Sequence, residues 1–168
     1  MEIPREQNKA LCEKYPFLIP TNRWSGKKIT TKEPGFWPGS PDAIPEYDYE
    51  YTELDEMPDG WRIAFGEEMM DELKAELETV PNGIDNFRIT QIKEKWGFLH
   101  FYCNGLTERG WKIVSKYEEL SKRICVICGK PATRVTTGWI SPFCDDCVPK
   151  YERSVSIEEY MKKDEDED

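Results

Sequence analysis

The clearest periodic pattern in the chain is an apolar stripe that repeats every four residues after a turn. Pro58-Asp59-Gly60 marks the turn, and Asp59 is placed to cap the helix that follows. The stripe consists of Trp61, Phe65, Met69, Leu73 and Leu77. Acidic residues fill much of the remaining circumference, so the pattern predicts an amphipathic helix that ends near residues 81–83.

A second long helix is predicted over residues 107–122, where a thinner apolar face recurs at helical spacing. That face comprises Trp111, Val114, Tyr117 and Leu120 or Ser121. Lys112 and Lys116 fall outside it. A shorter helix is expected over residues 5–15, with a thin apolar side made of Ala10, Leu11 and Tyr15.

Two short stretches between the long helices alternate apolar and polar residues as strands do. Residues 87–92 alternate imperfectly, because Phe87 and Ile89 are in phase and Ile92 is not. Residues 98–102 follow after the short connection 94–97. This arrangement predicts two antiparallel strands joined by a tight turn.

The segment before the first long helix, residues 16–58, is dense in proline and glycine. Such a density predicts an irregular, extended arm, which Trp24 and Trp37 are expected to hold against the core. At its end, residues 47–54 alternate tyrosines with acids. This alternation predicts an edge strand or docking strip with the tyrosines on one face and the acids on the other.

The pattern as a whole predicts an α+β fold: a small antiparallel sheet, two main helices and a C-terminal four-cysteine zinc ribbon or knuckle. Residues 1–124 form the α+β domain and residues 125–150 the zinc-binding module, which is packed on it because no linker separates them. Residues 151–168 are expected to be an acidic tail. Within the tail, Ser156 and Glu159 form a capping box for a short helix to about Met161.

The four C-terminal cysteines carry the strongest chemical signal. Cys125 and Cys128 form one Cys-x-x-Cys pair, and Cys144 and Cys147 form a second pair, with fifteen residues between the two pairs. This spacing is typical of one structural zinc ion held by four thiolates, a closed shell with no position for substrate. Two disulfides or a redox site are the alternatives. Of the remaining two, Cys12 and Cys103 are expected to be small buried side chains.

The net charge of −10 is unevenly distributed along the 168 residues. Residues 42–83 carry two basic and fourteen acidic residues, whereas residues 84–150 carry eleven basic and seven acidic residues. The acidic segment is expected to repel nucleic acid from one side and to attract basic proteins. Six tryptophans, seven phenylalanines and eight tyrosines supply large side chains for the core.

Two non-enzymatic functions fit these features. The first is a protein-interaction module that binds, and in some settings inhibits, a basic host or phage protein. Its candidate contacts are Tyr47, Asp48, Tyr49, Glu50, Tyr51, Glu53 and Asp55. The alternative is a nucleic-acid-binding zinc-ribbon protein that uses Trp96 or Trp139 for stacking. Its candidate phosphate contacts are Lys93, Lys95, Lys112, Lys116, Lys122, Arg123, Lys130 and Arg134.

Enzymatic activity, such as hydrolysis, is a third and weaker interpretation. His100 is the only histidine, and strand alternation places it on the opposite face from Cys103. The chain has no Gly-rich phosphate loop, dinucleotide fingerprint or His-Glu-x-x-His helix. Its N-terminus lacks the apolar core of a signal peptide and no apolar run approaches the length of a membrane span, so a cytoplasmic protein without a small-molecule cofactor is expected.

The residues around the predicted hairpin and cysteine module resemble a family of small proteins from bacteria, phages and prophages. The resemblance is carried in the C-terminal half by Gln91–Tyr102 with its Lys-Glu-Lys-Trp-Gly motif, Lys116–Ser121, Cys125–Ala132 and Gly138–Cys147. In the N-terminal half it is carried by Lys14–Pro20, Asn22–Trp24, Tyr51–Asp55 and Met57–Trp61. The resemblance implies a cellular setting, which is the host cytosol if the protein is phage-encoded. It does not imply an activity. His100 departs from the family, in which arginine is usual, and this weakens the assignment of the position as a fixed anion contact.

Overall fold

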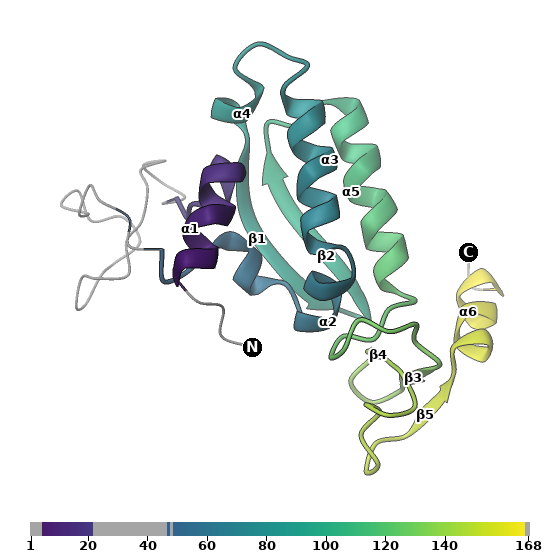
Figure 1. Cartoon of the computed structure of the whole chain (residues 1–168). Helices are drawn as coiled ribbons and strands as arrows, with labels where there is room; N and C mark the ends of the chain where they lie inside the picture. Colours follow the sequence, from purple (N-terminus) through teal and green to yellow (C-terminus); the bar gives the residue numbers. More distant parts are fainter. Residues whose placement is uncertain (1–4, 22–46, 48, 167–168) are drawn as a thin grey trace.

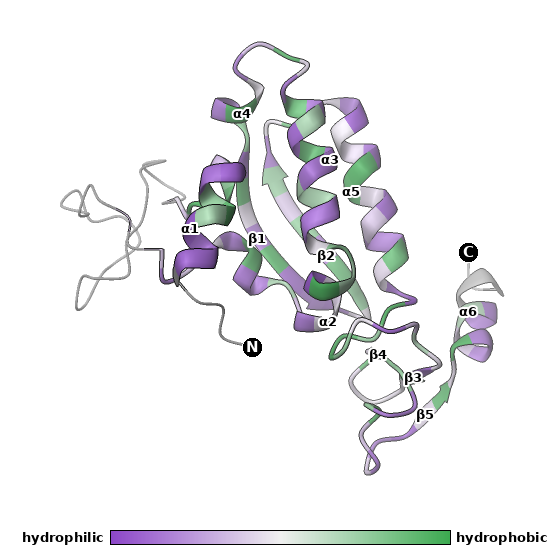
Figure 2. Ribbon diagram, in the orientation of Figure 1, coloured by the Kyte–Doolittle hydropathy of each residue, from purple (hydrophilic) through white to green (hydrophobic). Residues whose placement is uncertain are grey.

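A computed structural model describes residues 5–21, 47 and 49–166. Within them the fold is α+β, as predicted: strands β1 (Arg88–Lys95) and β2 (Phe98–Asn104) form an antiparallel sheet, and helices α3 (Glu67–Leu77) and α5 (Glu108–Ser121) lie side by side against it (Figure 1). The two helices show alternating hydrophobic and hydrophilic bands in Figure 2, as amphipathic helices do. The predicted pins Trp24 and Trp37 lie outside the described residues.

The five stripe residues that predicted the first long helix are all buried, each at most 2% exposed. The chain forms α2 (Asp59–Trp61), a π-helical turn η3 (Arg62–Gly66) and then α3. An α-helix has about 3.6 residues per turn, so a four-residue stripe would drift around it, and the wider π turn offsets part of this drift. The predicted cap is wrong, because Pro58 is the N-cap residue and Asp59 is the first residue of α2.

The hairpin forms as predicted, and a β-bulge explains the imperfect alternation of its first strand. Ile89 pairs with Cys103 and Gln91 with Tyr102, so Thr90 is the extra residue. The bulge shifts the alternation by one residue and lets both Ile89 and Ile92 face the core. Both strands also run longer than predicted, to Lys95 and Asn104.

Helix α5 begins where predicted, because Thr107 is its N-cap and accepts a hydrogen bond from the backbone N–H of Gly110 at 3.0 Å. The buried face differs from the prediction: Val114, Tyr117 and Ser121 face the core, whereas Trp111 and Leu120 are 45% and 40% exposed. The side chain of Ser121 accepts a hydrogen bond from the backbone of Leu99 at 2.8 Å, which ties α5 to β2.

Adjacent acids on α3 connect it to both neighbouring helices. Tyr15, which directly follows α1 (Arg5–Lys14), donates its hydroxyl hydrogen to Asp71 at 2.6 Å. Tyr117 of α5 donates to Glu72 at 2.7 Å, and Lys116 pairs with the same carboxylate at 2.5 Å. The hydrogen bond from Tyr15 holds the pKa of Asp71 below its ordinary value, and that from Lys116 does the same for the pKa of Glu72.

The predicted edge strand at residues 47–54 is wrong. Tyr49 has a φ of +62°, a left-handed conformation that interrupts an extended chain. Residues Glu53–Glu56 then form a 3-10 helix (η2), in which Asp55 accepts a hydrogen bond from the backbone of Thr52 at 2.6 Å. Tyr47 and Tyr49 do contact each other, with ring centroids 4.9 Å apart.

The cysteine module is larger than predicted. Its sheet has the order β4-β3-β5, formed by Pro142–Phe143, Arg134–Thr136 and Ser154–Ser156. Helix α6 (Ile157–Asp166) follows, and a second small core forms around Ala132, Val135 and Ile157. Residues 154–166, expected as a tail with only a short helix, therefore complete the module. Ser156 does cap α6, since its hydroxyl accepts a hydrogen bond from the backbone of Glu159 at 3.2 Å.

The module meets the α+β domain through a close backbone contact at α2. The N–H of Gly60 donates to Val126 at 2.9 Å, and the indole N–H of Trp61 donates to Ile124 at 2.9 Å. A Cβ on Gly60 would lie 2.0 Å from the carbonyl oxygen of Cys125. Only glycine fits this contact. None of the described helices is both long and apolar enough to span a bilayer.

We predict that Gly60→Ala destabilises the protein although alanine is the better helix former. The helix propensity gained is about 1 kcal/mol, whereas relieving the clash with Cys125 requires a backbone shift that costs about 1–3 kcal/mol or more. Denaturant unfolding measures the difference. Gly138→Ala is the matched control, since nothing lies within 4 Å of its added Cβ. Equal stability of the two variants would contradict the close contact.

We predict that the Glu72 pairing stabilises the protein at neutral pH and stops doing so in acid. Because the folded-state pKa of Glu72 is lowered, its contribution is complete above the ordinary value of 4.5 and is lost as the pH falls through the folded value. The side chain is 34% exposed, so we expect less than about 1 kcal/mol. Unfolding of Glu72→Gln should show a larger loss of stability at pH 7 than at pH 3, with Glu13→Gln as the control. An equal loss at both pH values would contradict this prediction.

Candidate metal centre and adjoining aromatic surface

The four predicted ligand cysteines come together at one point. The sulfur atoms of Cys125, Cys128, Cys144 and Cys147 all lie within 4.8 Å of one another. The sulfurs of Cys128 and Cys144, one from each pair, are 3.6 Å apart. The cluster is therefore a site at which four cysteines can hold a metal ion.

Tight turns point the sulfurs of each pair inward. The backbone N–H of Gly129, at φ +76°, donates to Cys125 at 3.1 Å, and that of Cys147 donates to Cys144 at 3.1 Å. The second turn directly follows β4, and the backbone of Val126 donates to Pro142 at 3.1 Å. Strand β4 thus brings the distant pair to the first one.

The thiol pKa values differ within the cluster, because burial and neighbouring thiols raise the pKa of Cys147 to about 12. Burial raises the pKa of Cys144, but hydrogen bonds with Cys128 and Cys147 outweigh burial and bring it to about 7. Burial raises the pKa of Cys103 to about 12, as expected for an inert side chain. All six cysteines are free thiols, and neither pair opens a helix as a redox pair would. Four sulfur ligands leave no open position for catalysis.

Beside the cluster, the outer face of the hairpin carries a row of rings. Its inner face buries Ile92, Leu99 and Phe101. Alternation therefore turns Phe98, His100 and Tyr102 outward. Ring centroids are 4.2 Å apart for Phe98 and His100 and 6.1 Å apart for His100 and Tyr102.

Three of the predicted phosphate contacts gather on this row. The Nζ of Lys95 lies 4.0 Å from the ring centroid of Trp96. The corresponding distances are 5.4 Å from Lys93 to Tyr102 and 5.1 Å from Lys122 to Phe98. Strand pairing explains the positions of Lys93 and Lys95, because Lys93 is opposite His100 and Lys95 is opposite Phe98 across the hairpin. Lys122 arrives from the end of α5 and also pairs with Glu119 at 2.7 Å.

The hairpin turn places a tryptophan in an unfavourable conformation. Trp96 and Gly97 have φ values of +55° and +83°, as a two-residue type I′ turn requires. Asparagine or glycine is usual at the first position, and a bulky residue there costs about 1–3 kcal/mol. The Trp96 side chain is nevertheless 64% exposed, so burial does not offset this cost.

Glu94 connects this turn to the cysteine module. One carboxylate oxygen accepts a hydrogen bond from the backbone of Gly97 at 2.8 Å, and the other accepts from the indole of Trp139 at 3.1 Å. Trp139 is 72% exposed. Its neighbour Ile140 contacts the turn so closely that a Cβ on Gly97 would lie 2.9 Å from it. Two exposed tryptophans, one from each part of the protein, are thus positioned by a single carboxylate.

The other predicted phosphate contacts lie elsewhere. Arg134 donates to the side chain and backbone of Ser154, both at 2.8 Å, and so joins β3 to β5. Lys130 pairs with Asp146 at 3.5 Å. Lys112 and Lys116 pair with acids on helices, and Arg123 is exposed beyond the end of α5. The basic residues therefore do not form one continuous patch.

The predicted acidic contact strip is not assembled on one surface. Tyr47 and Glu53 are buried, at 7% and 8% exposure. Asp55 pairs with Arg62 at 2.6 Å, and both side chains are largely buried. Of the remaining members, Tyr49 and Tyr51 are partly exposed and Glu50 is exposed, whereas Asp48 lies outside the described residues.

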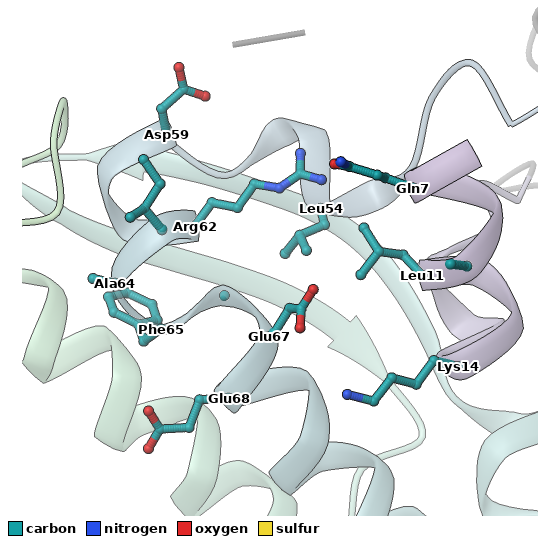
Figure 3. Close-up of a pocket in the computed structure, with 13 residues that line it drawn as sticks. Gln7, Leu11, Lys14, Leu54, Asp59, Arg62, Ala64, Phe65, Glu67 and Glu68 are labelled. Carbon is teal, nitrogen blue, oxygen red and sulfur yellow. The ribbon is translucent and has the colours of Figure 1, made fainter. Parts of the chain in front are cut away.

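A separate cavity of about 550 Å³ lies between α1 and the π-helical turn (Figure 3). Lys14 and Glu67 extend toward it from opposite sides, and its lining includes the apolar residues Leu11, Leu54 and Phe65. Its described lining contains no cysteine or histidine.

Sequence reasoning missed the ring row and Glu94. Phe98, His100 and Tyr102 share one phase of the β2 alternation, and that signal was available in the sequence. The partners of Glu94 were not predictable, because Trp139 is forty-five residues away along the chain. Its contact depends on how the module packs against the hairpin.

We predict one bound metal ion per chain, which a strong chelator removes with a loss of thermal stability. Cys144→Ser replaces one thiolate and should lower the metal content after a chelator challenge and destabilise the module. Metal analysis with thermal unfolding measures both. Cys103→Ala is the control, because this buried thiol lies outside the cluster and its loss leaves metal content unchanged. Full metal retention by Cys144→Ser would contradict the site.

Comparison with protein-family models, with curated proteins and with solved structures found no match for this chain.

Proposed function

We propose that the protein is a zinc-stabilised nucleic-acid-binding protein whose contact surface is the outer face of the β1–β2 hairpin. The observation that carries this proposal is the placement of Lys93, Lys95 and Lys122, each over an aromatic ring of the hairpin. Ammonium groups neutralise phosphates, and aromatic rings stack with bases. Both kinds of group are therefore present on one face.

Zinc is the metal that suits the cysteine cluster best. A tetrahedral set of four sulfurs is typical of zinc or iron, and two Cys-x-x-Cys pairs at this spacing favour zinc. Zinc–sulfur bonds of about 2.3 Å separate neighbouring sulfurs by about 3.8 Å in a tetrahedron. The 3.6 Å between Cys128 and Cys144 fits that geometry. The ion's role is to hold the module, and with it Trp139, against the hairpin.

The acids of α3 do not oppose binding at this face. The acids of α3, including Glu68, Asp71 and Glu72, lie on the helix layer that covers the opposite face of the sheet. At physiological salt, exposed charges separated by more than about 8 Å are largely screened from one another. A ligand on the hairpin therefore interacts more strongly with the three lysines than with the acids of α3.

Nucleic acid is better supported than a basic protein as the partner. The acidic strip that would bind a basic protein is divided, because Glu53 is buried and Asp55 pairs with Arg62. The resemblance to small bacterial and phage proteins supports a bacterial cytosol as the setting. There the protein would bind host or phage nucleic acid.

We predict that binding to an oligonucleotide weakens steeply with salt. Replacing Lys93, Lys95 and Lys122 with glutamine should lower affinity and reduce the slope of log K against log salt by about 0.7–1 per lysine lost. Fluorescence anisotropy across a salt series measures both.

The matched control replaces Lys74, Lys112 and Lys163, which have the same charge but lie in (i, i+4) ion pairs on helices. We expect the control to keep most of the affinity and slope. If both triple variants lose affinity equally, the effect is one of net charge, and the hairpin is not the contact surface.

A further inference from the structure

We infer that the ligand is an unpaired single strand, whose bases stack on Trp96 and Trp139 and along the row of Phe98, His100 and Tyr102. This inference rests on the proposed function and specifies its substrate class. It depends on the conformation of Trp96, on the role of Glu94 and on the accessibility of the hairpin.

The conformation of Trp96 is the first argument. This residue has a φ of +55° at a turn position that favours asparagine or glycine, and its ring is 64% exposed. A strained and exposed side chain contributes little to folding, so a contact with a ligand is the physical reason to have tryptophan there. The indole offers a large flat surface on which any base can stack.

The second argument is that Trp139 is held beside the same turn. Glu94 accepts hydrogen bonds from both Gly97 and the Trp139 indole, so it sets the turn and the second tryptophan together. The Trp139 side chain is 72% exposed and gains little from burial in the protein. Glu94 is thus a positioning residue for two stacking surfaces.

The geometry favours single strands over duplexes. A two-stranded ribbon in the major groove reads the edges of paired bases with hydrogen-bonding side chains, and it does not stack on their flat faces. Here α3 and α5 cover the inner face, so only the outer face is available (Figure 1). Paired bases keep their flat faces inside the helix, whereas unpaired bases present them to aromatic rings. The exposed rings therefore match a strand with unstacked bases.

The lysines exclude a cationic ligand and complement a phosphate backbone. An aromatic cage for an ammonium group needs rings without a competing cation, yet the Nζ of Lys95 already lies 4.0 Å from the Trp96 centroid. A base that stacks on Trp96 displaces this flexible ammonium toward the adjoining phosphate. One nucleotide thereby engages both groups.

The first test compares ligands of equal length: a DNA single strand, an RNA single strand, the corresponding DNA duplex, and heparin, which is anionic but has no bases. We expect the single strands to bind at least ten-fold more tightly than the duplex or heparin and to quench tryptophan fluorescence. A preference for RNA or for DNA identifies the natural strand, and either result supports the inference.

The second test uses Trp96→Asn, which introduces a residue that the turn favours. We expect equal or higher thermal stability, about 5-fold or greater loss of single-strand affinity, and an unchanged salt slope. Trp111→Gln is the matched control, because this tryptophan is 45% exposed on α5. It should retain full affinity.

The third test uses Glu94→Ala. Removing an acid beside lysines would tighten binding of any polyanion if charge alone mattered. The positioning role predicts a weaker single-strand affinity, whereas the affinity for heparin, which has no bases to stack, rises or stays unchanged.

The outcomes separate this inference from the proposed function. Equal binding of duplex and single strand, with Trp96→Asn unaffected and the lysine triple variant weakened, overturns the inference and leaves nucleic-acid binding in place. No binding to any ligand at low salt overturns both. Tighter single-strand binding by Glu94→Ala overturns the positioning role of Glu94.

Discussion

The structure depends on one close backbone contact, between the start of α2 and the first cysteine turn. Gly60 lacks a side chain where a Cβ would lie 2.0 Å from the carbonyl of Cys125, and the next residue, Trp61, hydrogen-bonds Ile124. Helix α5 also runs directly into this turn. The contact therefore fixes the cysteine cluster relative to both main helices. Because the sheet packs on those helices, it also fixes where Trp139 meets the hairpin.

This dependence links metal binding to the aromatic surface without any direct contact between the ion and a ligand. A closed four-sulfur site does no chemistry, but it anchors the turns between which residues 129–143 run. A metal ion held by the four cysteines would support β3, β4 and the Trp139 loop, while the α3–α5–sheet core has its own packing. Lys93, Lys95 and Lys122 lie over rings of the hairpin although the net charge of the chain is −10.

Local patterns predicted the main helices, the hairpin and the four cysteines, because each is defined by residues close in sequence. The failures came from longer-range contacts. Tyrosine alternation suggested a strand, but the φ of +62° at Tyr49 interrupts it. Arg134 looked like a phosphate contact until β5 supplied Ser154 as its partner. The bulge at Thr90 and the bridging role of Glu94 depend on how separate elements pack.

Photochemical cross-linking of the protein to a single-stranded oligonucleotide, followed by mass spectrometry of the linked peptides, tests the central claim most directly. Aromatic side chains stacked on bases cross-link efficiently only where they touch. The account predicts linked peptides that contain Trp96, Tyr102 or Trp139 and share the outer hairpin surface. Cross-links confined to α3, to residues 49–56 or to the cavity beside α1 would contradict it.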